Sequence, residues 1–186
     1  MGASDRKVDL VGDRVDCVVR GGAITDLSLT ARRVAELKLG VYASPNYLER
    51  AGTPVHPGEL DGERHRIVRF RWSGSGNGFP YVLRRGTVEL RLQGQHILSI
   101  DDGNAYLAAG LAGLGVLWLP DYMARQHVDD GRLVPLFVQW ESDPMPLYIA
   151  YPQNRHISKA LRAFIDWIVE IMAEHAPAWD EARHGV

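Results

Sequence analysis

Short apolar runs alternate with stretches of helical periodicity along most of the chain, and this alternation limits the fold more than any other feature. The apolar runs are four to six residues long, and the segments between them have room for helices. This order is typical of α/β proteins, in which helices pack against sheets. Strands are predicted at Val15–Val19, Gly40–Ala43, Ile67–Phe70, Thr87–Leu92, Gly115–Leu119 and Leu147–Tyr151.

Two short helices are predicted from end signals and composition. The first begins at Ser44, whose hydroxyl can cap a helix, followed by Pro45 at the first helical position, and it ends near Gly52. The second runs from about Gly103 to Gly113. Its alanines and leucines leave almost no polar face, so we expect this helix to be buried in the protein.

A third helix follows Ser158, which is a natural N-cap. Apolar residues then recur at helical spacing, and charged residues fall between them. Burying five such side chains contributes on the order of 10 kcal/mol before conformational entropy is subtracted, so this helix should be essential to its part of the fold. The predicted core face consists of Leu161, Phe164, Ile165, Ile168 and Met172.

The charge balance limits what the chain can bind. Its 186 residues include 21 Lys+Arg and 23 Asp+Glu, a formal net charge of −2. A domain that neutralises phosphates is normally basic, so we expect any DNA contact to come from another part of the protein. No apolar stretch approaches the ~20 residues that span a bilayer, and residues 2–7 lack the apolar core of an export signal. We predict a cytoplasmic protein with no membrane partner.

Catalytic and metal-binding motifs are missing from the sequence. There is no Gly-x-Ser-x-Gly elbow and no phosphate loop ending in Gly-Lys-Ser/Thr. The glycine-rich segment Trp72–Gly78 lacks a following helix that could meet a phosphate, so we interpret it as a flexible loop. The seven histidines show no pair at ligand spacing, and the single cysteine, Cys17, lies among valines as an expected inert thiol. We predict no enzyme activity, no cofactor and no metal.

Two charged patches have structural interpretations. The basic run Arg64–Arg71 resembles a nucleic-acid contact, but strand alternation would divide its arginines between two faces, which favours a solvated or loop-bracing strand. Asp101 and Asp102 resemble a carboxylate pair. They stand immediately before the predicted helix at Gly103, where an acidic side chain caps the helix and complements its dipole.

Several motifs, in a fixed order, resemble the LysR-type transcriptional regulators. None is specific alone, but the resemblance extends without interruption from residue 4 to about residue 172. The motifs lie at residues 4–11, 15–22, 27–33, 43–48, 108–116 with 119–120, 131–136, 146–152 with 155–158, and 162–166.

The resemblance implies a two-lobed α/β fold of the type II periplasmic-binding-protein kind, with a ligand in the cleft between lobes. Lobe I would comprise 1–41 plus 142–186, and lobe II would comprise 42–141. Members of this family are cytoplasmic, form dimers and tetramers, and bind DNA through an N-terminal winged helix-turn-helix. That head is not in this sequence, and the strand, helix and strand that open the family's effector domain are also missing before Ser4. We therefore expect an N-terminally truncated lobe I.

The resemblance also points to candidate effector-binding residues. Arg20 ends an apolar strand before two glycines, so its guanidinium has room to turn toward a bound anion. The loop after the third predicted strand would supply an aromatic wall. The full set of predicted site residues is Ala3, Ser4, Arg20, Gly21, Trp72, Ser73, Ile100, Asp101 and Asp102.

Two function classes stay open on the sequence alone. A sensory domain would bind a small, polar or anionic metabolite and signal to the DNA-binding head. A solute-binding protein of the same fold would use the cleft for capture alone. An esterase-type enzyme is a distant third class, because no nucleophile has a recognisable base nearby.

Overall fold

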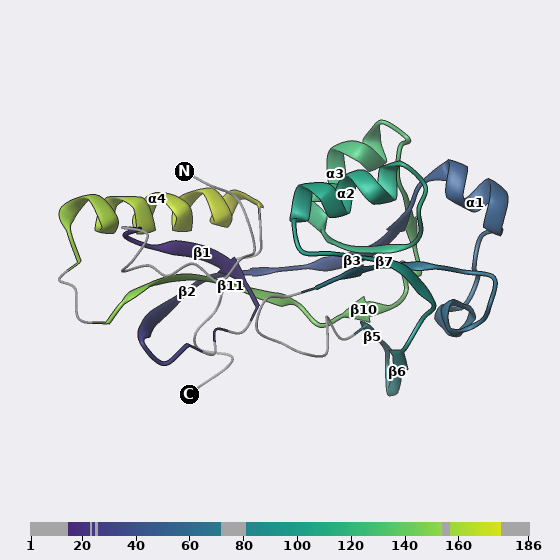
Figure 1. Ribbon diagram of the computed structural model, residues 1–186, viewed down its shortest axis with the longest axis horizontal. Coiled ribbons are helices and arrows are strands. Elements are labelled where there is room, and N and C mark those ends of the chain that lie inside the picture. The colour runs from purple at the N-terminus through teal and green to yellow at the C-terminus, as the bar shows by residue number, and fades with distance from the viewer. Residues whose placement is uncertain (1–14, 23, 25, 72–80, 154–156, 176–186) are drawn as a thin grey trace. The chain divides into compact units, whose positions relative to one another are not determined.

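The computed structural model describes residues 15–22, 24, 26–71, 81–153 and 157–175, which fall into two compact units (Figure 1). The described residues from Leu39 to Asp143 form unit 1. The described residues up to Lys38, together with those from Pro144 onward, form unit 2.

Unit 1 is built on a sheet in which β3 (Leu39–Ala43) pairs antiparallel with both β8 (Leu117–Pro120) and β9 (Val134–Leu136). The strands β4 (Ile67–Phe70) and β7 (His96–Ile100) pair in parallel. Hydrogen bonds from Val68 N–H to the Val116 carbonyl at 3.0 Å, and from Val116 N–H to the Arg66 carbonyl at 2.8 Å, join β4 to the segment that leads into β8.

The helices of unit 1 are α1 (Pro45–Ala51), α2 (Gly103–Leu111) and α3 (Asp121–Asp129), with a 3-10 turn, η1, at Pro57–Asp61. Ser44 caps α1 as predicted, accepting from the Tyr47 N–H. A small antiparallel sheet of β10 (Glu141–Ser142), β5 (Tyr81–Arg85) and β6 (Val88–Leu92) completes the unit.

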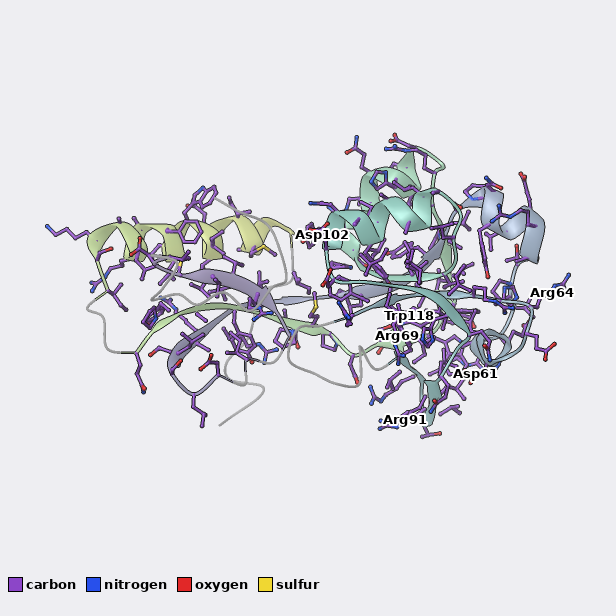
Figure 2. All side chains as sticks on the ribbon, viewed as in Figure 1. Asp61, Arg64, Arg69, Arg91, Asp102 and Trp118 are labelled. Atoms are coloured by element: carbon purple, nitrogen blue, oxygen red, sulfur yellow. The ribbon has the colours of Figure 1, made fainter. Side chains whose placement is uncertain are left out.

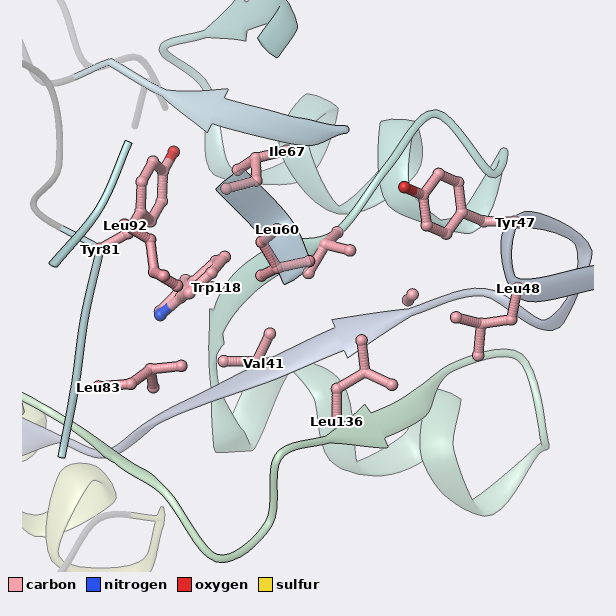
Figure 3. Close-up of a cluster of buried hydrophobic side chains, with 12 residues drawn as sticks. Val41, Tyr47, Leu48, Leu60, Ile67, Tyr81, Leu83, Leu92, Trp118 and Leu136 are labelled. Atoms are coloured by element: carbon pink, nitrogen blue, oxygen red, sulfur yellow. The ribbon is translucent and has the colours of Figure 1, made fainter. Parts of the chain in front are cut away.

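Side chains cover both faces of the β8-β3-β9 sheet. One cluster joins Val41, Val116 and Trp118 to residues of α1, η1, β5 and β6 (Figure 3). The other joins Tyr42, Leu117 and Leu119 to α2 and α3. Neighbouring residues of each strand therefore enter opposite cores, which explains why these strands read as continuous apolar runs.

The turn between α2 and β8 depends on three glycines. A Cβ on Gly110 would lie 2.0 Å from a Leu117 methyl carbon, and one on Gly115 would lie 2.6 Å from the Arg66 carbonyl oxygen. Gly113 adopts a φ of 78°, a conformation that side chains disfavour. These glycines let α2 and β4 approach β8 closely.

Unit 2 contains an antiparallel sheet in the order β1 (Val18–Gly21), β11 (Met145–Pro152) and β2 (Leu29–Leu37). Helix α4 (Lys159–His175) packs against this sheet. The cluster between them has four buried members, Ile149, Tyr151, Leu161 and Ile165. Two further predicted core residues, Phe164 and Ile168, pack against it half-buried.

Most predicted elements are confirmed within one to three residues at each end. The expectation that α2 is buried all round is wrong. Tyr106, Ala109 and Gly110 are buried, while Ala105 and Ala108 are exposed. Alanine is apolar but small, so exposing it to water costs little and the helix can lie at the surface.

Candidate functional site

Three predicted site residues lie at the edge of unit 1 where β4 and β7 end. Because these strands are parallel, their carboxyl ends meet at one edge, with Phe70 beside Ile100. The Arg71 N–H donates to the Ile100 carbonyl oxygen at 2.8 Å and extends the pairing. Asp101 and Asp102 follow and lead into α2. In open α/β sheets, ligands bind outside the carboxyl ends of the strands.

Asp102 caps α2, as predicted, at the N-terminal end of the helix (Figure 2). Its Oδ1 accepts from the Ala105 N–H at 2.8 Å, which satisfies one of the amides that lack a partner within the helix. Asp101 is instead exposed, with its Oδ2 3.3 Å from Nη2 of Arg71. Exposed ion pairs of this kind contribute about 0–1 kcal/mol, so an incoming ligand can displace this one at little cost.

Two buried tyrosines hold the end of β4 in place. Tyr81 Oη accepts from the Phe70 N–H at 3.3 Å. The Tyr106 ring packs edge-on against the Phe70 ring, 5.3 Å between centroids, and Tyr106 Oη accepts from the Trp118 N–H at 3.0 Å. Burial raises the pKa of Tyr81 to about 12 and that of Tyr106 well above its usual value. Both hydroxyls therefore stay neutral and serve as fixed hydrogen-bonding groups.

Arg20 and Gly21 lie on β1 of unit 2, opposite Tyr148 and Leu147 of β11. The sequence predicted open space around the glycines after Arg20. The structure corrects this at Gly21, because a Cβ there would lie 2.9 Å from the sulfur of Met145. The space beside Gly21 is therefore occupied by the flexible end of the Met145 side chain.

The remaining predicted site residues, Ala3, Ser4, Trp72 and Ser73, lie outside the described residues. The glycine-rich segment Trp72–Gly78 does so as well. The five described candidates fall into two groups, with Arg20 and Gly21 in unit 2 and Ile100, Asp101 and Asp102 in unit 1.

The basic run Arg64–Arg71 braces loops, the interpretation favoured by the sequence. Arg66 Nη1 donates to the His65 carbonyl at 3.0 Å and to the Glu63 carbonyl. Arg69 Nη1 lies 3.4 Å from Nε2 of His96. These contacts use the guanidinium groups of Arg66 and Arg69 within the unit.

Titratable clusters suited to catalysis are not found in the described parts of the chain. Across residues 15–71, 81–153 and 157–175, apart from the few that are not described, no group of three or more His, Cys, Asp or Glu side chains could hold a metal. Burial, and then the nearby charge of Asp16, raise the pKa of the Cys17 thiol, which keeps it protonated and weakly nucleophilic. None of the helices in the described segments is long and apolar enough to cross a membrane.

Three further residues lie at the edge of unit 1 where β4 and β7 end, and the sequence did not predict them: Arg71, Tyr81 and Tyr106. For Arg71 a signal exists, since an arginine directly after an apolar strand is the same feature that drew attention to Arg20. Tyr81 lies on β5 and Tyr106 lies on α2, so only the packed fold brings them to Phe70.

Comparison with known proteins gives a consistent result over almost the whole chain. Residues 1–173 match the LysR substrate binding domain family. An HTH-type transcriptional repressor of Pseudomonas aeruginosa is 33% identical over 177 residues, covering 94% of this chain and 55% of the repressor. An uncharacterized HTH-type transcriptional regulator of Escherichia coli, YhjC, is also 33% identical, with 94% and 58% covered. The chain thus spans little more than half the length of these relatives.

Solved structures agree on the fold. The regulatory domain of CrgA, a LysR-type transcriptional regulator from Neisseria meningitidis, superposes with a TM-score of 0.73 at 28% identity, covering 90% of this chain and 80% of that domain. The predicted mixed α/β fold of the type II periplasmic-binding-protein kind is therefore confirmed.

Proposed function

The chain belongs to the LysR-type transcriptional regulators, as their substrate-binding domain, and from this premise we propose that it senses a small polar or anionic metabolite. In this proposal lobe I, residues 1–41 plus 142–186, and lobe II, residues 42–141, hold the ligand between them. A ligand that contacts both lobes favours the arrangement in which they close on it, because it can shift an equilibrium only by binding one state better.

The main support for the proposal is the edge of unit 1 where β4 and β7 end. There the ends of two parallel strands, Phe70 and Ile100, adjoin the N-terminus of α2. The helix dipole favours negative charge at this position. Rigid support by Tyr81 and Tyr106 means that little ordering is needed when a ligand binds.

The ligand class follows from the charged groups at the candidate positions. Arg20 of unit 2 and Arg71 at the edge of unit 1 can each form charge-assisted hydrogen bonds to a carboxylate. Such a bond contributes about 1.5–3 kcal/mol, enough to separate carboxylates from neutral compounds of equal size. We therefore place small carboxylates first among candidate effectors.

The rest of the regulator is proposed from the family. A DNA-binding winged helix-turn-helix would precede this domain in a cytoplasmic dimer or tetramer, and the names of the relatives as HTH-type regulators support this arrangement. A net charge of −2 agrees with a domain that senses and does not itself bind DNA. Capture of solutes for transport, the alternative function, has no support among these relatives.

A thermal-shift screen of metabolites tests the proposal. Small carboxylates should raise the melting temperature of the wild-type chain, and Arg20→Ala should weaken the best of them by about tenfold or more, the loss expected for one charge-assisted hydrogen bond. Arg32→Ala is the matched control, because Arg32 is an exposed arginine of the same unit outside the candidate set. If only neutral apolar compounds stabilise the protein, and Arg20→Ala leaves their binding unchanged, the proposed function is wrong.

A further inference from the structure

Helix α4 carries a second apolar stripe beside the face that packs on the sheet of unit 2. Leu161 and Ile165 of the packed face are buried in the cluster with β11. Each residue turns an α-helix by about 100°, which places the second stripe about 100° around the helix from these core positions. The stripe consists of Ala160, Phe164, Trp167 and Ile171.

The stripe presents apolar surface to solvent. Trp167 is 51% exposed and is not a member of the buried cluster of unit 2. Ala160 is exposed, and Ile171 is half-buried. Phe164 borders the cluster, and its ring centroid lies 5.9 Å from that of Trp167. Single exposed apolar residues are ordinary, but a continuous row of them along a helix indicates an interaction surface.

The spacing of the stripe is that of a coiled-coil seam. Its four members are separated by four, three and four residues, the a/d repeat that allows two helices to pack side by side. A seam of this kind fits an equivalent seam on another helix, since the side chains of one enter the gaps between the side chains of the other. A second copy of α4 supplies such a seam.

Charged residues beside the stripe favour an antiparallel pair of α4 helices. Lys159 lies in the first turn and Glu170 about three turns later, both exposed and both on the same side of the stripe. In a parallel pair, each of them would stand beside its own copy, with like charges together. In an antiparallel pair, Lys159 of each chain lies near Glu170 of the other, so opposite charges meet at both ends of the seam.

The sizes of the side chains fit the same orientation. If the helices are antiparallel and centred on the stripe, Ala160 of one copy faces Ile171 of the other, and Phe164 faces Trp167. Small and large side chains then alternate across the seam, which favours close packing. A parallel pair would place Ala160 against Ala160 and leave a gap at that level.

We propose that Ala160, Phe164, Trp167 and Ile171 form the interface of a homodimer in which two α4 helices pack antiparallel. The inference does not rest on the proposed ligand, because none of the candidate effector-binding residues lies on α4. Four apolar side chains from each copy make a small interface, in the class below about 1,200 Å², and the dimer therefore has a dissociation constant of about 10–100 μM.

Sedimentation equilibrium of the whole chain, at concentrations from about 5 to about 500 μM, tests this inference. The mass should rise from that of one chain to that of two. Trp167→Ala should weaken association by about tenfold or more, because a tryptophan at the centre of an interface commonly dominates its affinity. Circular dichroism should show unchanged helix content, since Trp167 lies outside the buried cluster.

Charge reversals test the orientation. Lys159→Glu and Glu170→Lys should each weaken the dimer about three- to tenfold at low salt, because like charges then meet at both ends of the seam. The two changes combined in one chain should restore the dimer, since opposite charges meet again. Arg162→Glu is the matched control, because Arg162 is exposed on the side of α4 opposite the stripe, and it should leave association unchanged.

Three results would each overturn the inference. The first is the mass of a single chain at every concentration, which would leave the stripe to another occupant, such as a helix of a different protein. The second is a dimer that Trp167→Ala does not weaken. The third is a pair of charge reversals that behave like Arg162→Glu, or that do not compensate each other when combined. None of these results bears on metabolite binding, which the Arg20→Ala experiment tests separately.

Discussion

Unit 1 and unit 2 bury their sheets in different ways. Unit 1 covers both faces of its main sheet, with one cluster of twelve buried residues and another of eight. In the described part of unit 2, a single cluster of four buried residues lies between three strands and α4. Arg20, Tyr148 and Arg33 are half-buried on the other face of that sheet. The described part of unit 2 is therefore less deeply packed than unit 1, whose edge at the ends of β4 and β7 is held by buried side chains.

A cavity in the core of unit 1 should have the largest effect on stability. Leu117 of β8 is fully buried in the cluster that joins this strand to α2 and α3. Leu117→Ala should lower the free energy of unfolding by about 3–5 kcal/mol, because the loss of methylene burial is added to the cost of a residual cavity. Urea unfolding followed by circular dichroism measures this. Ile97→Ala, at an exposed position of β7, is the control and should change stability by less than about 0.5 kcal/mol.

The corresponding cavity in unit 2 should have a smaller and more local effect. Ile165 of α4 is buried in the four-residue cluster. Ile165→Ala should cost about 2–3 kcal/mol, since a small cluster can partly collapse around the missing atoms. Hydrogen exchange resolved by segment should show faster exchange in β1, β2 and β11, with unchanged protection in β3 and β8. Equal acceleration in both units would show that they unfold as one, and the division between them would not hold.

Acid should weaken unit 1 through His65. This side chain is 2% exposed, beside Tyr47, and burial lowers its pKa from the usual value near 6.5. The unfolded chain then binds a proton more readily than the folded one, so stability is lost as pH falls below about 6.5 toward the lowered pKa. In the wild type, the urea concentration at the midpoint of unfolding should decrease when the pH is lowered from 7.5 to 5.5. His65→Gln should reduce this dependence, and a dependence of unchanged size would assign the effect to other groups.

The sequence predicts well those elements whose signals are local. α1, with its Ser44 cap, and β4 lie at the predicted residues, and α4 follows its apolar periodicity. β2 and α3 were not predicted. In β2 the polar residues Thr30, Arg32, Arg33 and Glu36 interrupt the apolar run, and in α3 only Ala124 is buried. These two elements are defined by their contacts with distant segments, which local patterns do not contain.

The candidate site residues also differ in whether local signals or long-range strand pairing determine their positions. The capping role of Asp102 depends on residues three positions away and was predicted correctly. The alignment of Arg20 with Tyr148 and Arg33 depends on strand pairing between residues more than one hundred positions apart and on a bulge at Val34. No single-sequence pattern encodes such a register. The sequence alone places Arg33 only at the end of the motif at residues 27–33.

The proposed function requires one ligand to engage groups of both lobes. Hydrogen exchange with and without the strongest carboxylate from the thermal-shift screen tests it most directly. Bound ligand should slow exchange at β1 and the start of β11 in unit 2, and also at residues 100–106 of unit 1, and Arg20→Ala should abolish both effects at the same ligand concentration. Slower exchange in only one unit, or slowing in both that persists in Arg20→Ala, would contradict the claim.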